Sequence, residues 1–174
     1  TKSLVPFAAS SIPLVTLGTF LLWFGWFGFN GFSQLAMGTF DDVNAISKIA
    51  VNTHLAGAAG TVAAAVVTRL LGGKTDIVMM LNGALAGLVA ITAEPLTPSP
   101  VLAIVIGAIG SLIMYFGTKF LESKKIDDVV GAIPVHMFAG IFGTLVVPIS
   151  NPDTNFGTQI TGVIAVCLFS FILS

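Results

Sequence analysis

The sequence predicts an all-α polytopic membrane protein with about six transmembrane helices. Of its 174 residues, 55% are hydrophobic and only 9% are charged, and the mean hydropathy is +1.00. Soluble domains contain about 25% charged residues, so this chain has too little polar surface to cover a water-soluble fold. Charge-free stretches of roughly 20 residues, the length of a membrane-spanning helix, recur along the whole chain.

The expected helices divide a single domain that covers residues 1–174. They occupy residues 13–37, 44–71, 76–93, 100–121, 128–149 and 156–174. Asn44 is a candidate N-cap of the second helix, because its side chain can accept a bond from a free backbone N–H. Gly72 and Gly73 favour the end of that helix, since glycine readily adopts the left-handed conformation found there.

Proline and charged residues set the later boundaries. The third helix is expected to end before the proline-rich stretch 94–100, which cannot continue a helix. The fourth ends in a basic turn around Lys124. Asp127 and Asp128 stand where the fifth helix begins, and acidic side chains there cap the helix and complement its dipole. The sixth begins near Phe156 and is apolar to the last residue.

The basic residues indicate the orientation of the chain. If residue 1 lies on the cytoplasmic side of a plasma or inner membrane, only Lys48 of the seven falls outside. Six basic residues then lie inside, as the positive-inside rule expects. These are Lys2, Arg69, Lys74, Lys119, Lys124 and Lys125.

The two ends of the chain suggest a piece of a longer polypeptide. The sequence begins with Thr1 rather than Met, and it stops inside a hydrophobic segment after Leu173. A processed or trimmed chain would have the same appearance.

Small and polar residues inside the apolar stretches predict close helix packing. Glycine and alanine recur at helical spacing, which allows helix backbones to approach closely in lipid. Polar side chains in the same stretches are expected to form hydrogen bonds between helices. They are Gln34, Asn52, Thr53 and Asn82.

His136 is the candidate functional residue that the sequence singles out. No charged residue lies between Asp128 and Asp153, and an ionisable group at membrane depth is costly and usually functional. Pro134 removes a helical hydrogen bond two residues earlier, so the helix should kink or loosen beside a cavity or other protein groups. The alternative is a neutral imidazole that ties two helices together.

Other classes of site find little support. His54 lies near the outer end of the second helix, where a structural role is expected. The two histidines have no carboxylate, cysteine or third histidine at ligand spacing, so no metal is expected. The sequence contains no nucleophile elbow, His-Glu-x-x-His motif or phosphate loop, so we expect neither an enzyme nor a cofactor. No basic tract indicates nucleic acid.

An aromatic and glycine-rich tract covers residues 22–31. Trp26 and Phe29 are three residues apart and share a helix face. Ring faces attract cations, and tryptophan does so best. The alternative interpretation is an aromatic belt at the membrane interface, although the tract falls in the middle of the expected helix.

Three stretches together resemble the Amt/Mep/Rh family of ammonium transporters. They are residues 17–31, residues 81–89 and residues 125–136. The likeness covers essentially the whole chain, in order, and places it as the second half of such a transporter, spans six to eleven of eleven. It implies a C-terminal inverted repeat plus the last helix, in a homotrimer with one conduction pathway per subunit.

The resemblance also implies roles for individual residues. His136 corresponds to the second of two paired pore histidines, and Phe29 to one of two phenylalanines that block the outer pore mouth. Trp26 matches a position along the pore, and Ser33 a position at the outer site that recruits ammonium. The first histidine and the other phenylalanine would belong to the first half. A cytoplasmic regulatory protein is a further candidate partner.

The expected function is transport of ammonium or ammonia across the lipid bilayer. Moving a bare ion into hydrocarbon costs roughly tens of kcal/mol, so ammonium tends to lose its proton instead. His136 and a partner histidine would handle that proton. Phe32 stands where the family usually has glycine and could crowd the outer vestibule, which favours the alternative of a sensor that binds without conducting. A non-conducting structural fragment is the third hypothesis.

Overall fold

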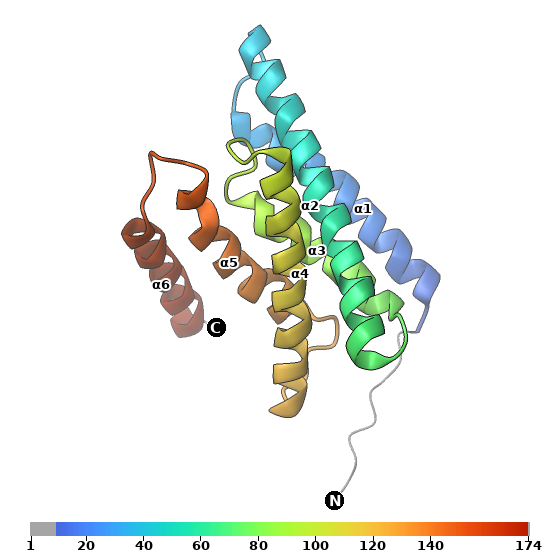
Figure 1. Cartoon of the computed structure of the whole chain (residues 1–174). Coiled ribbons are helices and arrows are strands. Elements are labelled where there is room, and N and C mark those ends of the chain that lie inside the picture. Colours follow the sequence, from blue (N-terminus) through green and yellow to red (C-terminus); the bar gives the residue numbers. More distant parts are fainter. Residues whose placement is uncertain (1–9, 174) are drawn as a thin grey trace, which may run out of the picture.

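The computed structural model describes residues 10–173, which form helices and connecting segments with no β-strand among them (Figure 1). The α-helices are α1 (Ile12–Gly31), α2 (Phe40–Gly72), α3 (Ile77–Thr92), α4 (Pro100–Ser123), α5 (Ala139–Val146) and α6 (Phe156–Leu173). Shorter helical segments are the 3-10 turns η1 (Phe32–Gln34) and η3 (Val147–Ile149) and the π-helical turn η2 (Ile133–Phe138).

The helices match the six apolar stretches of the sequence. By length and composition, α1 with η1, α2, α4 and α6 could each cross a membrane, and the other two apolar segments are shorter, Ile77–Thr92 and Ile133–Ile149. The 16 residues of α3 span about 24 Å, a little less than the hydrocarbon core of a bilayer. In Figure 1, α1 and α6 lie at opposite edges of the bundle, with α3 and α4 between them.

The connection between α1 and α2 differs from the expected one. The first helix was expected to reach residue 37, but α1 ends at Gly31, and Leu35 has a left-handed φ of 60° that stops the chain from continuing. Asn44 does not cap the second helix. Thr39 caps it instead, and its hydroxyl accepts from the N–H of Asp42 at 3.1 Å while Asp42 accepts from the N–H of Thr39 at 3.0 Å.

The ends of the next helices follow their local sequence. The second helix stops at Gly73, which has a φ of 75°. Asp76 caps α3 by accepting from the N–H of Met79 at 3.1 Å. Ser99 caps α4, and Pro100 stands in its first turn, where a missing N–H costs nothing.

The fifth apolar stretch begins later than residue 128, after a break at Gly131, whose φ is 75°. Asp128 accepts bonds from the N–H groups of Ala132 and Ile133 at 2.9 and 2.8 Å. Pro134 therefore lies in the first turn of the helix. The loosening expected near this proline takes the form of the π-helical turn η2, in which the carbonyl of Pro134 accepts from the N–H five residues later.

Glycine contacts hold α2, α3 and α4 at short range. A Cβ added to Gly60 of α2 would collide with the backbone of Gly83 in α3, and one added to Gly107 of α4 would collide with the backbone of Ala56 in α2. The expected close packing of small residues is confirmed at these positions. Direct backbone contact thus brings these three helices together at the bundle centre.

The four polar residues expected to bond between helices all form hydrogen bonds, but Thr53 and Gln34 bond to another helical segment, whereas Asn52 and Asn82 bond to connecting segments. Asn52 of α2 is fully buried and donates to the carbonyls of Pro95 and Pro98 at 2.9 Å each, which fixes the loop between α3 and α4. The other bonds are Asn30 to Thr53, Asn82 to the carbonyl of Val130, and Gln34 to Asp42.

Candidate functional site

Trp26 is fixed by a bond between two helices. Its indole Nε1 donates to Oγ1 of Thr92 in α3 at 2.7 Å, and that hydroxyl donates onward to the carbonyl of Leu88 at 2.7 Å. The ring of Trp26 also packs on the apolar cluster that contains Leu88 and Val135. The indole is therefore held in one orientation by a polar and an apolar contact together.

Phe29 lies one helical turn after Trp26 and next to it in space. The two ring centroids are 5.8 Å apart, with an interplanar angle of 54°. The side chain of Phe29 is exposed, because 65% of its surface is accessible in this chain. The pair forms an aromatic wall whose outer part is free to meet another group.

Ser33 follows in the 3-10 turn η1. Its hydroxyl donates to the carbonyl of Phe29 at 3.2 Å, and the side chain is exposed. A hydroxyl that donates its proton to the backbone keeps lone pairs directed outward, and these can accept a bond from a cation such as ammonium. Phe32, beside it, is 77% exposed, with its ring edge 3.5 Å from the place a Cβ of Gly28 would occupy.

His136 is presented by the π-helical turn η2. Its side chain is exposed, whereas Pro134 and Val135 directly before it are buried. No hydrogen bond joins the imidazole to another residue within 10–173. In this part of the chain, therefore, no hydrogen bond of His136 ties two helices together. Val135 belongs to the same apolar cluster on which Trp26 packs, and this links the two candidate segments.

The supporting roles of two residues were not predicted from the sequence. Thr92 is 66 positions from Trp26, and nothing local marks it as the partner of an indole. Asn82 donates to the carbonyl of Val130 at 3.1 Å, in the loop that leads to η2. The sequence indicated Asn82 as a bond former but not that it would support the segment of His136.

His54 lies on an aromatic surface between α1 and α2. Its ring is 5.6 Å from that of Trp23 and 6.2 Å from that of Phe27, with the latter pair stacked. No group of three or more His, Cys, Asp or Glu side chains within 10–173 is arranged to hold a metal ion. These contacts agree with a packing role for His54.

Comparison with known proteins supplies the family. The model of the Ammonium Transporter Family matches residues 2–173. The chain belongs to this family. Ammonium transporter Amt2 of Archaeoglobus fulgidus is 46% identical over 151 residues, which is 87% of this chain and 31% of that protein.

Solved structures of the family share the fold. The chain superimposes on a structure described as a sensor Amt protein with a TM-score of 0.86 at 38% identity, covering 94% of this chain and 42% of that one. Mep2 of Candida albicans gives a TM-score of 0.88 at 26% identity, covering 98% and 41%. The chain is thus an all-helical, multi-pass membrane protein of the ammonium transporter family.

The matched region is only part of the relatives. The chain spans about a third of the length of the curated relatives it matches, from 31% to 36% for the first three. Their names describe ammonium transporters, not enzymes. What the complete relatives do is a property of a longer polypeptide.

Proposed function

We propose that this chain is the second half of a transporter that moves ammonium or ammonia through a hydrophobic pore, and that His136 handles the proton. The observation that carries the proposal is an exposed imidazole on a π-helical turn in a chain of the ammonium transporter family. π-Helical turns occur frequently at functional sites. The imidazole has no bonding partner within 10–173, so both ring nitrogens are available to a substrate or to a second histidine.

The chemistry follows from the cost of burying charge. An ammonium ion in an apolar pore loses its hydration, and the loss favours the neutral form. A histidine changes charge near neutral pH and has one nitrogen that donates and one that accepts, so it can take the proton and pass it on. In this proposal, His136 accepts a hydrogen bond from the substrate and forms one part of the proton path.

Recruitment would take place at the aromatic wall and the adjacent hydroxyl. The faces of Trp26 and Phe29 attract a cation, and Ser33 offers an acceptor one turn further along. The bond from Trp26 to Thr92 orients the indole. Phe29 would then separate the outer site from the pore that contains His136.

The family also guides proposals about the assembly. We place the protein in the plasma or inner membrane, with the side of residue 1 in the cytoplasm, as a homotrimer with one pathway per subunit. The lysines at the inner ends of the helices would form the surface that a cytoplasmic regulatory protein could bind. The positive-inside pattern supports the orientation.

Ammonium-driven current across a membrane that contains the intact protein tests the role of His136. The variant His136→Ala is expected to abolish the current or change its selectivity. His54→Ala is the matched control, because it removes an exposed histidine that packs on Trp23 and Phe27. Current and selectivity that stay unchanged in His136→Ala would remove His136 from the mechanism.

A second candidate function is sensing. One of the similar structures is described as a sensor Amt protein, and the exposed ring of Phe32 stands next to Ser33, where it would narrow the entrance. A sensor would bind ammonium with little flux. In this case Phe32→Gly should increase the current while ammonium binding persists, whereas a conducting protein would show a similar current before and after the change.

A further inference from the structure

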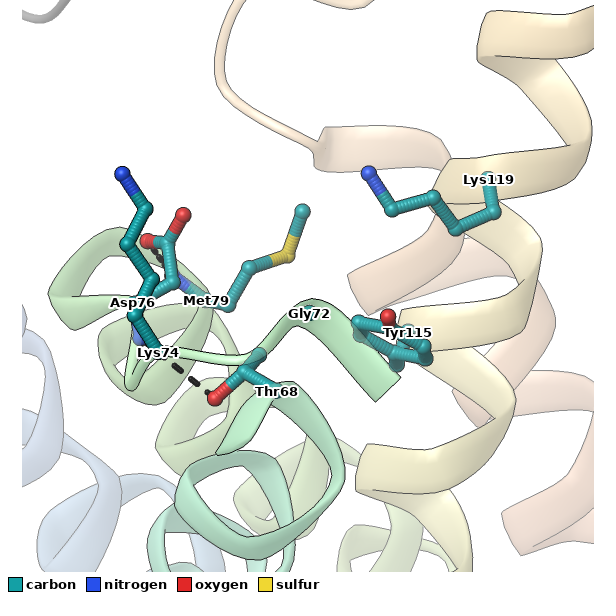
Figure 2. A pocket seen from close by; sticks show the side chains of 7 residues that line it. All are labelled: Thr68, Gly72, Lys74, Asp76, Met79, Tyr115 and Lys119. Atoms are coloured by element: carbon teal, nitrogen blue, oxygen red, sulfur yellow. Dashed lines mark hydrogen bonds between the residues drawn. The ribbon is translucent and has the colours of Figure 1, made fainter. Parts of the chain in front are cut away.

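A small pocket lies at the end of the bundle where α2 turns into α3 and where α4 ends (Figure 2). We call it the inner-end pocket, and its volume is about 120 Å³. By the same measure a single water molecule needs about 10–15 Å³, so the pocket has room for a small polyatomic group such as a phosphate. It is separate from the segments that carry Trp26 and His136.

Two lysines stand on opposite walls of the inner-end pocket. Figure 2 shows Lys74 on one side and Lys119 on the other, with the side chain of Met79 between them. Lys74 forms no ion pair or hydrogen bond with any residue from 10 to 173. Lys119 pairs with Glu122 at 3.0 Å, but both side chains are more than half exposed, and an ion pair of this kind is weak and exchangeable.

Tyr115 adds a hydroxyl without a partner. Only 7% of its surface is accessible, and it lines the pocket. Its hydroxyl forms no hydrogen bond within the described part of the chain, and its oxygen is not among the buried atoms there, so it can donate to a molecule in the pocket. The donors available to a ligand here are therefore this hydroxyl, the ammonium group of Lys74, and that of Lys119 when it leaves its exposed pair with Glu122.

The other polar groups that line the pocket already form hydrogen bonds within the protein. The carboxylate of Asp76 accepts from the N–H of Met79 at 3.1 Å. The hydroxyl of Thr68 donates to the carbonyl of Ala64 at 2.7 Å and accepts from the N–H of Asp76 at 3.4 Å. Donors are in excess, and the two lysines outweigh the one carboxylate, so the pocket is suited to an anion with several oxygen acceptors.

The position of the pocket indicates the source of that anion. It lies at the end of the helices that carries most of the basic residues, and in the orientation proposed above this end faces the anionic lipids of the cytoplasmic leaflet. Basic pockets between helices on that side bind lipid headgroups. We propose that the inner-end pocket binds the phosphate of an anionic phospholipid, held by Lys74 and Lys119 and by a bond from the Tyr115 hydroxyl.

Native mass spectrometry of the intact protein, titrated with phosphatidylglycerol, tests this proposal. Tyr115→Phe should weaken binding of the lipid about tenfold, as expected for a hydrogen bond to a charged group. The melting temperature of the Tyr115→Phe variant should not change, because the hydroxyl has no protein partner within 10–173. Binding equal to that of the unmodified protein would overturn the role of Tyr115 and with it the proposed site.

Two double variants distinguish binding in the pocket from a general attraction of the basic surface to acidic lipid. Lys74→Gln with Lys119→Gln should lower affinity about 25-fold, at about fivefold for each lysine near an anionic surface. Lys124→Gln with Lys125→Gln removes the same charge outside the pocket and should have a clearly smaller effect. Equal losses in the two proteins would show that the lipid is held by the overall field, which would refute the pocket.

Competition with inorganic phosphate tests whether the bound phosphate belongs to a lipid headgroup or is a free anion. Phosphatidylglycerol should remain bound when millimolar phosphate is added, because its acyl chains stay in the apolar surroundings. Displacement of the lipid by phosphate, together with saturable binding of phosphate alone, would show that the site takes the free anion and would overturn the assignment to a lipid.

Discussion

The indole of Trp26 and the hydroxyl of Thr92 form a bond of 2.7 Å that connects α1 to the end of α3. Through this bond the orientation of a candidate pore residue depends on a threonine that lies 66 positions away in the sequence. The bond also gives the indole N–H an acceptor in Thr92, the last residue of α3.

Thr92→Val should therefore destabilise the protein. The change keeps the shape of the side chain but leaves the half-buried Nε1 of Trp26 without an acceptor, at a cost of about 1–3 kcal/mol. Thermal unfolding in detergent measures the effect, and tryptophan emission should shift. Thr61→Val is the control, because the Thr61 hydroxyl donates only to the carbonyl of Gly57 in its own helix. Equal melting of the two variants would contradict a special role for Thr92.

Asp128→Ala should loosen the start of η2. The carboxylate accepts bonds from the N–H groups of Ala132 and Ile133, and replacing a cap of this kind by alanine costs about 0.5–2 kcal/mol. Hydrogen exchange should become faster at these two amides. Asp127→Ala removes the same charge at an exposed neighbour, so unchanged exchange at these two amides is expected in that variant.

Gly107→Ala should be poorly tolerated although the change is small. The new Cβ would meet the backbone of Ala56, which cannot move away as a flexible side chain would. Overpacking of this type costs about 1–3 kcal/mol. Gly18→Ala is the matched control, since no atom lies within 4 Å of the position its Cβ would take. A melting temperature of Gly107→Ala at or above that of the control would argue against direct backbone contact.

Ser33→Ala should weaken capture of ammonium and leave the maximum current nearly unchanged. Loss of one acceptor corresponds to about 1 kcal/mol, or about a fivefold rise in the concentration that gives half-maximal current. Ser47→Ala is the control, because Ser47 is also exposed and its hydroxyl donates in the same way to a carbonyl four residues earlier, at 2.8 Å. A fall in maximum current without a change in half-saturation would assign Ser33 to a later step.

The sequence predicted the fold well because the determinants of the fold are local. Hydrophobic length identified the helices, and Gly73, Asp76 and Pro100 marked ends that the structure also has. The start of α2 was misassigned to Asn44. Thr39 and Asp42 satisfy each other as well as the backbone, and this reciprocal arrangement is more effective than a single amide cap.

The candidate site was less accessible to sequence reasoning. The cost of an ionisable group in an apolar segment identified His136, but its proposed role came from resemblance to a family. The geometry at Trp26 depends on contacts between segments far apart in the chain, and no periodicity encodes such contacts. Pro134 did signal an irregular helix, but not that the irregularity would be a π turn.

The π turn of residues 133–138 makes the number of residues in this segment important, apart from their identity. A π turn closes its hydrogen bond one residue later than an α turn, so it contains one residue more. Deleting a single residue here would convert the π turn into an ordinary α-helical turn, because the deletion removes the extra residue that the wider turn accommodates. The flanking segments would then keep their relative rotation, while the side chains inside the turn, that of His136 among them, would point in new directions. The length of η2 therefore helps to fix the direction in which His136 points.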